Sequence, residues 1–395
     1  MIAVIDHVGG IVMLNEEQLK KVVALRHALH ACPERSGHEA RTMAAIRAFL
    51  SENTTLELRD MGGWLLATHR EGEGLPEIGF RADMDALPVE GTESDASHGG
   101  DVRHGGDASH GGDARHGCGH DGHSAILCGL ALLLEGRRVG KNVRLIFQAA
   151  EETGEGARRV LETWPGIKNL SALYALHNIP GHPRGAVLMR RGCFSCASCG
   201  HIVRVQGRPA HAAYPGDGAN PIELLSRLAL DTPEMIDEIL NGDGRLLMRT
   251  LIGLRAGGEN FGISAAEGQL NQTLRGHRKA DIDALIAKIE ARVRAGCEAE
   301  NMRCAFELRD VFPDTTGDDA VFDDAMARFR AAGLPIRLLD EPMRWSEDCG
   351  WLLKAVPGLY FGIGAGEEHP GLHTAEYGFD DDLIEPAVRA FEALL

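Results

Sequence analysis

The densest group of residues that could perform chemistry is Cys-Gly-His-Asp-Gly-His at 118–123. The neighbouring carboxylates Glu151 and Glu152 follow about 30 residues later, and His177 and His373 come further along the chain. Thiolate, imidazole and carboxylate form the ligand set that a borderline-soft dication such as Zn²⁺ accepts. A carboxylate beside the metal can take a proton from a metal-activated water. These residue types therefore predict a metal site that can hydrolyse an amide.

The elements that must position these residues can be predicted from apolar patterns. Apolar residues at helical spacing predict helices at 16–31, 39–51 and 124–136, the last with Ser124 as an N-cap. Short apolar runs predict strands at 56–61, 64–69, 77–84, 143–152 and 170–178. Strands that alternate with helices predict an α/β domain with a mostly parallel central sheet flanked by helices. Each candidate site residue lies at or just beyond the end of a predicted strand, where open α/β sheets build their sites.

Residues 192–312 show a different pattern, with strand, helix, two strands, helix and strand in turn. This order predicts a compact α+β layer of its own. We therefore expect one domain from residues 1–191 and 313–395, which contains all the candidate metal ligands, and an inserted α+β domain at 192–312.

Composition excludes several classes of function. The 395 residues include 58 acidic and 41 basic side chains, for a net charge of -17. Nucleic acid and anionic membrane carry the same sign, so neither is an expected partner. No run of about 20 apolar residues is present, so no membrane span is expected. Nine scattered cysteines, an odd number, are typical of reduced thiols and favour a cytoplasmic protein.

The chain resembles the dinuclear-metal amidohydrolase and peptidase family that includes hippurate hydrolases, plant auxin-conjugate hydrolases and bacterial N-acyl-amino-acid deacylases. The similarity extends over nearly the whole chain. It is carried by GFRADMDALPVE, HGCGHDGHSAILCG, VRLIFQAAEETGEGA, ALHNIPGHPRGAV, GRPAHAAYPGDGANPI and GIGAGEEHPGLHTAEYGFDDD. The combination of Cys-Gly-His-Asp-Gly-His with a later Glu-Glu is highly specific to this family.

The resemblance implies a role for each matching residue of the first domain. The ligands of two divalent ions, with Zn or Mn expected and Co or Ni as alternatives, would be Cys118, His120, Glu152, His177 and His373. Glu151 would be the general base and later the proton shuttle to the leaving amine. Asp83 and Asp85 would lie behind the site and orient the ligands.

The resemblance also implies a role for the inserted domain: it would cover the site as a lid and form the contact between two subunits. A homodimer through this domain is therefore expected. His211 would polarise the scissile carbonyl from the neighbouring subunit. Asn260 and Arg275 would bind the substrate carboxylate, for which a guanidinium has the right shape, although their local motif departs from the commoner family form.

The implied activity is hydrolysis of the amide bond of small N-acyl amino acids, with Glu151 activating a metal-bound water. A dipeptidase or carboxypeptidase on the same fold is the alternative within the class. Cys118 favours the amidohydrolase, because the peptidase branches generally place a carboxylate at that position. A catalytically silent metal-binding protein is the alternative outside the class, and the presence of Glu151 argues against it.

Three further motifs have both a functional and a structural interpretation. A six-residue His-Gly-Gly-Asp repeat at 97–116 contains His98, His104, His110, Asp101, Asp107 and Asp113. It could collect metal, but an expanded, solvated loop is the favoured interpretation. Cys193, Cys196 and Cys199 have the spacing of a metal or cluster site, yet no fourth ligand is evident, so buried small side chains are favoured. The pair Glu347-Asp348 matches a family segment, and helix capping explains it equally well.

Overall fold

The structure is a computed structural model that describes residues 7–8, 11–89 and 113–395. The chain forms two compact units, and each is described by itself. The first comprises the described residues up to Phe194 together with Thr316–Glu341 and Asp348–Leu395. The second comprises Ser195–Thr315 and Pro342–Glu347.

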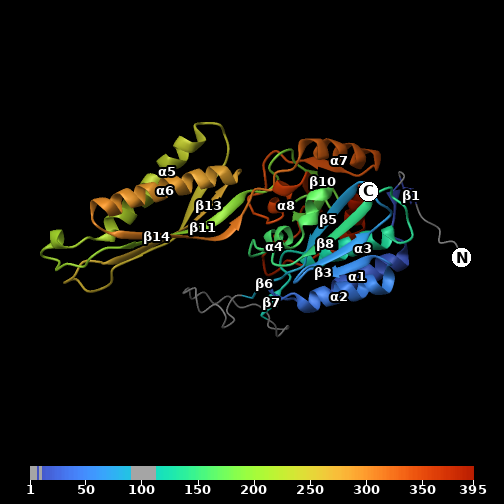
Figure 1. The fold of residues 1–395 in the computed structure, drawn as a ribbon, viewed down its shortest axis with the longest axis horizontal. Coiled ribbons are helices and arrows are strands. Elements are labelled where there is room, and N and C mark those ends of the chain that lie inside the picture. The colour runs from blue at the N-terminus through green and yellow to red at the C-terminus, as the bar shows by residue number, and fades with distance from the viewer. Residues whose placement is uncertain (1–6, 9–10, 90–112) are drawn as a thin grey trace. The chain divides into compact units, whose positions relative to one another are not determined.

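The first unit is built on an eight-stranded sheet with helices packed against it (Figure 1). Its strands lie in the order β15-β10-β16-β9-β5-β8-β4-β3. The strands are β3 Glu57–Asp60, β4 Leu65–His69, β5 Glu77–Asp83, β8 Asn142–Gln148, β9 Leu170–Pro180, β10 Val187–Met189, β15 Ile336–Leu338 and β16 Gly358–Gly366. The central strands β16, β9, β5 and β8 run parallel, while β10 joins β16 and β4 joins β8 in the antiparallel sense. This confirms the predicted α/β class with a mostly parallel sheet.

Helices pack against this sheet and close its core. They are α1 Glu16–His30, α2 Ala40–Asn53, α3 His120–Leu134, α4 Gly156–Thr163, α7 Asp319–Ala331, α8 Gly350–Ala355 and α9 Ile384–Ala393. Helix α3 is buried along its whole length and packs against α1, α9 and β5. Two short pairs, β1 His7–Val8 with β2 Ile11–Val12 and β6 Leu87–Pro88 with β7 Ala114–Arg115, complete the unit.

The predicted start of α3 was wrong. The helix begins at His120, and its N-cap is Gly119, not Ser124. Ser124 lies inside the helix, where its hydroxyl donates to the carbonyl of Asp83 at 2.7 Å. The first turn of α3 therefore consists of residues from the Cys-Gly-His-Asp-Gly-His motif, which places part of that motif at a helix N-terminus.

The second unit is a four-stranded antiparallel sheet with two helices. Its strands are β11 Ala197–Gln206, β12 Leu247–Ala256, β13 Glu267–Gly276 and β14 Arg303–Phe312, in the order β12-β13-β11-β14. Helices α5 Pro221–Leu240 and α6 Lys279–Ala299 pack together and cover one face of the sheet. Burial alternates along β13, as expected of a strand with only one face covered.

In the described part of the chain, none of the helices combines the length and the apolar character needed to cross a membrane. Most of the His-Gly-Gly-Asp repeat, including His98, His104 and His110, lies outside the described residues. Asp113 is described, and its carboxylate pairs with Arg35 Nε at 3.2 Å.

Candidate metal centre

The site forms at the carboxyl edge of the parallel strands. Asp83, the last residue of β5, is paired in the sheet with Gln148, the last residue of β8. Glu151 and Glu152 follow β8 directly, and His177 lies near the end of β9. Because these strands are neighbours, residues that lie far apart in the sequence meet at one edge of the sheet.

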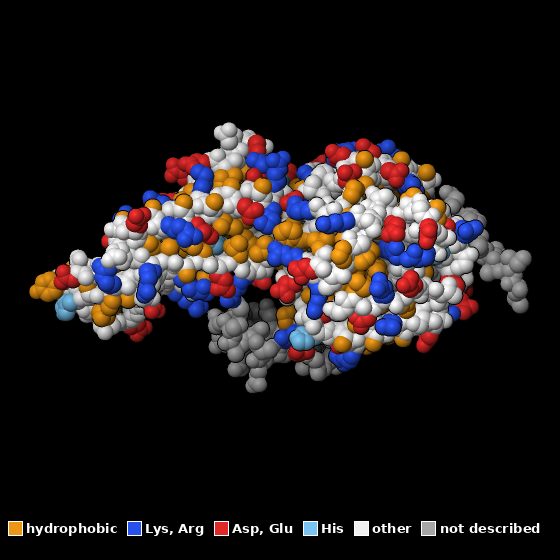
Figure 2. Space-filling model, in the orientation of Figure 1, with side chains coloured by type: hydrophobic (Ala, Val, Ile, Leu, Met, Phe, Trp, Pro, Cys, Tyr) orange, Lys and Arg blue, Asp and Glu red, His pale blue; other side chains and the backbone are white. Residues whose placement is uncertain are grey.

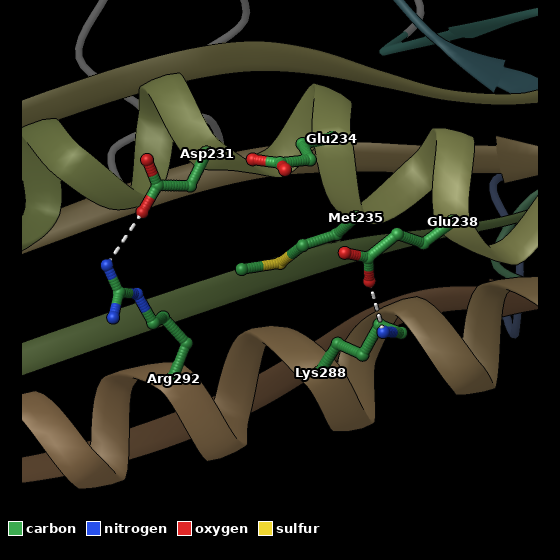
Figure 3. Close-up of a pocket in the computed structure, with 6 residues that line it drawn as sticks. All are labelled: Asp231, Glu234, Met235, Glu238, Lys288 and Arg292. Atoms are coloured by element: carbon green, nitrogen blue, oxygen red, sulfur yellow. Dashed lines mark hydrogen bonds and ion pairs between the residues drawn. The ribbon is translucent and has the colours of Figure 1, made fainter.

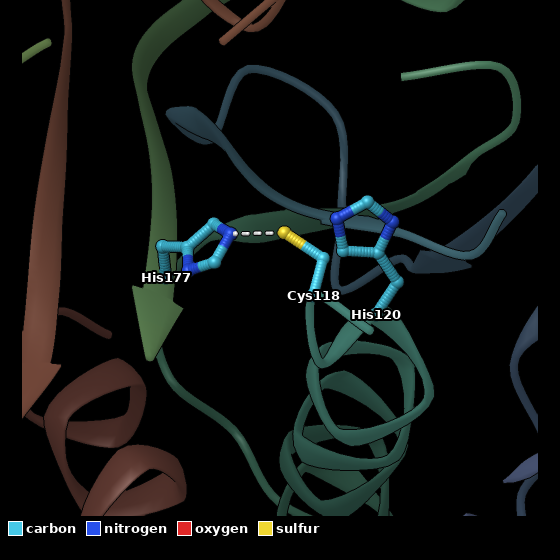
Figure 4. A group of neighbouring side chains, drawn as sticks. All are labelled: Cys118, His120 and His177. Atoms are coloured by element: carbon cyan, nitrogen blue, oxygen red, sulfur yellow. Dashed lines mark hydrogen bonds between the residues drawn. The ribbon is translucent and has the colours of Figure 1, made fainter. Parts of the chain in front are cut away.

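Cys118, His120 and His177 form the first group of potential ligands (Figure 4). One ligand atom from each lies within 4.8 Å of the others, and Cys118 Sγ is 3.3 Å from His177 Nε2. Cys118 reaches this position through a tight turn at Gly119, where φ is +100°. A Cβ atom on Gly119 would lie 2.4 Å from Asn178 Oδ1, so the turn requires glycine.

Cys118, Glu152 and His373 form a second group, again with ligand atoms within 4.8 Å of one another. Glu152 Oε1 lies 3.7 Å from His373 Nε2 and 3.9 Å from His120 Nε2. The structure therefore brings together all five residues that the sequence suggested as ligands. Cys118 belongs to both groups.

Two aspartates orient the histidines of the motif. His120 Nδ1 lies 3.1 Å from Asp85 Oδ1 and 3.0 Å from the carbonyl oxygen of Asp85. The other ring nitrogen of His120, Nε2, is therefore the one that can act as a metal ligand. His123 Nδ1 pairs with Asp83 Oδ1 at 2.6 Å, and its Nε2 pairs with Asn178 Oδ1 at 2.7 Å. Both ring nitrogens of His123, the second histidine of the motif, are engaged, so this side chain is a structural partner of Asp83.

Burial and neighbouring charges shift the pKa values in the site. Burial, with Glu152 nearby, raises the pKa of the Cys118 thiol to about 12. Burial alone would lower the pKa of His120, but Asp83, Cys118 and the bond to Asp85 together raise it well above its ordinary range. Burial and His123 hold the pKa of His177 well below its ordinary range. Without metal, Cys118 and His120 are thus protonated near pH 7 while His177 is neutral.

The residues fit divalent metal ions. His120 Nε2 is buried and, within the described residues, has no hydrogen-bond partner, while its Nδ1 is fixed by Asp85. A histidine held through one ring nitrogen with the other left for the ion is the usual arrangement of a metal ligand. The thiol, three imidazoles and carboxylate of the two overlapping groups form a donor set suited to Zn²⁺ and similar ions.

Glu151 lies beside this donor set. Its side chain is buried, and carboxylate oxygens of Glu151 and Glu152 lie within 4.8 Å of His120. Successive residues of a regular strand point to opposite faces. Here β8 ends at Gln148, and Ala150 adopts a left-handed φ of 54°, so both glutamates approach His120. Glu151 Oε1 accepts a hydrogen bond from the backbone N–H of Asp348 at 3.2 Å.

The other predicted site residues belong to the second unit. His211 is exposed and forms a β-bridge with Ile263, and Asn260 lies in the same loop as Ile263, between β12 and β13. Arg275 lies on β13 and donates to the hydroxyl of Ser346 at 2.8 Å. The structure thus brings the segments of His211 and Asn260 together within this unit.

Two other features of the second unit do not resemble a metal site. A surface groove of about 440 Å³ between α5 and α6 is crossed by ion pairs, Asp231 with Arg292 at 2.9 Å and Glu238 with Lys288 at 2.6 Å (Figure 3). Its charged side chains therefore largely neutralise one another. Cys196 and Cys199 are buried, and no group of potential ligands among the described residues includes them or Cys193.

Comparison with known proteins identifies the family. The model of peptidase family M20/M25/M40 matches residues 79–395. The chain belongs to this family. It is an M20 metal-dependent amidohydrolase, as the resemblance in its motifs indicated.

Two proteins of similar sequence are named as deacetylases of N-acetylated amino acids. The chain is 28% identical to a Bacillus subtilis N-acetyl-L-cysteine deacetylase, with 92% of this chain and 85% of the relative covered. It is 27% identical to a Shouchella clausii N-acetyldiaminopimelate deacetylase, with 96% and 98% covered.

Solved structures share the fold. A putative aminohydrolase from methicillin-resistant Staphylococcus aureus has a TM-score of 0.84 at 22% identity, with 96% of each chain covered. A Bacillus subtilis dinuclear metal binding peptidase from the M20 family has a TM-score of 0.76 at 22% identity, with 96% of this chain and 98% of that one covered.

Proposed function

We propose that this chain hydrolyses the amide bond of small N-acyl amino acids with two divalent ions. The observation that carries the proposal is the pair of ligand groups that share Cys118, which together would hold the ions. The proposed ligands are Cys118, His120, Glu152, His177 and His373. Relatives named as deacetylases of N-acetylated amino acids support the substrate class. Thiolate and imidazole donors favour Zn, and the carboxylates also suit Mn, with Co and Ni as alternatives.

The residues of the chain have distinct tasks in this reaction. Bound divalent ions would supply Lewis acidity and acidify a water for attack on the acyl carbon. Glu151 takes the proton from the attacking water and delivers it to the leaving nitrogen. Its carboxylate is buried and oriented by the N–H of Asp348, so few water molecules compete for the proton. Asp85 and Asp83 keep the rings of His120 and His123 in place.

The second unit would supply the remaining contacts. We propose that it acts as a lid, that His211 donates to the carbonyl oxygen, and that Asn260 and Arg275 bind the substrate carboxylate. We also propose a homodimer through this unit, with His211 acting in the partner subunit's site. Within the described sheet, β12 is an edge strand, and its Leu251, Ile252 and Leu254 are exposed.

The surface of the second unit is consistent with such a contact. Figure 2 shows hydrophobic side chains at its surface, and exposed apolar residues beside an unpaired strand edge are typical of protein contacts. The nine cysteines are all free thiols, which is consistent with the proposed cytoplasmic location.

A panel of substrates tests the activity. Enzyme loaded with Zn²⁺ or Mn²⁺ is assayed for release of free amine from acetyl-, benzoyl- and long-chain acyl-amino acids and from matched dipeptides. We expect at least one N-acyl amino acid to have a kcat/KM at least about tenfold above its matched dipeptide, a difference of about 1.4 kcal/mol. Chelation should abolish the activity, and metal should restore it. Faster cleavage of the dipeptides would favour the peptidase alternative.

A further inference from the structure

The loop that carries Glu151 and Glu152 is bonded at both ends to one carboxylate, that of Asp348. At one end, Gln148 Nε2 donates to Asp348 Oδ1 at 2.8 Å and to Oδ2 at 3.0 Å. At the other end, the backbone N–H of Ala157 in the first turn of α4 donates to Oδ2 at 2.8 Å. The segment between these two anchor points contains both glutamates. Asp348 is 0% exposed, so water does not compete for these bonds.

Asp348 also contacts the proposed base directly. Its backbone N–H donates to Glu151 Oε1, although the two residues are 197 positions apart in the chain. One residue therefore positions the loop through its side chain and orients the carboxylate of Glu151 through its main chain. Capping of the helix that follows does not explain Asp348, because α8 has no side-chain cap.

The buried charge of Asp348 is paired with Arg81, whose guanidinium it shares with Asp83. The guanidinium donates to Asp348 Oδ1 at 2.9 Å, to Asp83 Oδ2 at 2.7 Å and to Gln148 Oε1 at 2.9 Å. The side chains of Arg81, Asp83 and Asp348 are all 0% exposed. Apolar residues of similar volume often replace such buried ion networks without loss of stability, so fold stability alone is a weak account of this one.

The loop needs support from outside because its conformation is unfavourable. Ala150 has a φ of 54°, a region that residues with a Cβ atom rarely adopt. Its backbone N–H donates to the buried carboxylate of Glu39 at 2.8 Å. Strained positions persist only where their surroundings determine them strongly. Glu39, Asp85 and Asp348 each accept a hydrogen bond from an amide in or beside this loop.

We propose that Asp348 is a positioning residue for Glu151, with Arg81 as its neutralising partner. It keeps the loop after β8 in the conformation that places the Glu151 carboxylate beside the ligand group. The proposal rests on the proposed role of Glu151 as the general base.

The test is Asp348→Asn, which keeps the size of the side chain and replaces one acceptor by a donor. We expect kcat to fall at least about tenfold, because small displacements of a reacting group can cost about 10²-fold. KM should stay within about threefold, and two metal ions should still bind. In a Glu151→Gln background, the same substitution should cause no further loss, because it acts through Glu151.

A matched control separates positioning from the general loss of a buried ion pair. Glu392 on α9 is a buried carboxylate paired with Arg137 at 3.0 Å, and Glu392→Gln should leave kcat within about twofold of wild type. Hydrogen exchange on the metal-free proteins gives a second readout. Amides of residues 149–157 should exchange faster in Asp348→Asn than in wild type or in the control.

A second variant keeps the proposal testable where Asp348→Asn does not fold. Gln148→Met keeps every charge and removes the bonds at the β8 end of the loop, so we expect a kcat at least about threefold lower with KM unchanged. A folded, metal-loaded Asp348→Asn with kcat within about twofold of wild type overturns the proposal. A loss that adds fully to that of Glu151→Gln also overturns it. Wild-type activity in Glu151→Gln alone would instead overturn the proposed function.

Discussion

Cys118 lies where the two ligand groups meet, and its chemistry couples metal binding to pH. Burial raises the pKa of its thiol to about 12, so the thiol keeps its proton near neutrality in the metal-free protein. Metal ions bind the thiolate, so this proton must leave on binding. His120, with its pKa well above the ordinary range, must lose a proton as well, whereas neutral His177 loses none.

Metal affinity should therefore rise with pH. Both groups have metal-free pKa values above neutrality, so raising the pH from 6 to 8 favours the binding form. The expected increase in affinity for Zn²⁺ is up to about tenfold per pH unit for each proton released. Titration calorimetry in buffers of different ionisation heat measures the protons directly. Cys118→Ser should release about one proton fewer, and an affinity that does not change with pH would contradict this account.

At the residue scale, the sequence could predict the ligand types but not their supports. The thiol, imidazoles and carboxylates are recognisable by type and spacing, and they lie together in the fold. Asp348 and Arg81 were not predicted as site residues, because their contacts join segments far apart in the chain. The only signal for Asp348 was its place beside Glu347 in a segment shared with the family.

At the element scale, the strands and helices could be predicted because most of them bury one or two faces, and a buried face leaves a regular pattern of apolar residues in the sequence. Strand β5 is buried along nearly all its length, and burial alternates along β13. The start of α3 was predicted wrongly because its first turn contains buried His120, Asp121 and His123 where an apolar pattern would be expected. The left-handed turn at Gly119 marks the boundary, and sequence periodicity does not register it.

The His-Gly-Gly-Asp repeat should not be needed for turnover. Described residues before and after the segment 97–108 already pair, β6 with β7, and Val89 N–H donates to the carbonyl of Asp113 at 3.0 Å. Changing the length of a connection between paired ends costs little free energy. Deletion of residues 97–108 should leave kcat within about twofold of wild type and two ions bound. A tenfold loss of rate or a lower metal content would show that the repeat contributes to the site.

At the scale of the whole molecule, one chain builds two units. Most of the second, Ser195–Thr315, is inserted in the sequence between Phe194 and Thr316 of the first, and Pro342–Glu347 also belongs to it. The proposed ligands and Glu151 lie in the first unit, while His211 lies in the second. A donor to the developing oxyanion typically contributes about 2.7–4 kcal/mol, so the proposed role of His211 predicts a large loss in His211→Ala.

Mixing of variants tests whether the site is shared between subunits. Glu151→Gln and His211→Ala homodimers should each be nearly inactive. After subunit exchange, a hybrid dimer has one site with an intact Glu151 and an intact His211 from opposite chains. About half of the dimers would be hybrids with one working site, so about a quarter of wild-type activity is the expected ceiling. Exchange confirmed by mass without recovered activity would place His211 outside the partner's site.

The proposed base is tested most directly by the single substitution Glu151→Gln. Turnover of the best substrate from the panel and metal content are measured on the same purified samples of wild type and variant. We expect two bound ions in both proteins, an unchanged fold and a kcat about 10²–10⁴-fold lower in the variant. A fully metal-loaded Glu151→Gln enzyme with activity within about threefold of wild type would contradict this expectation.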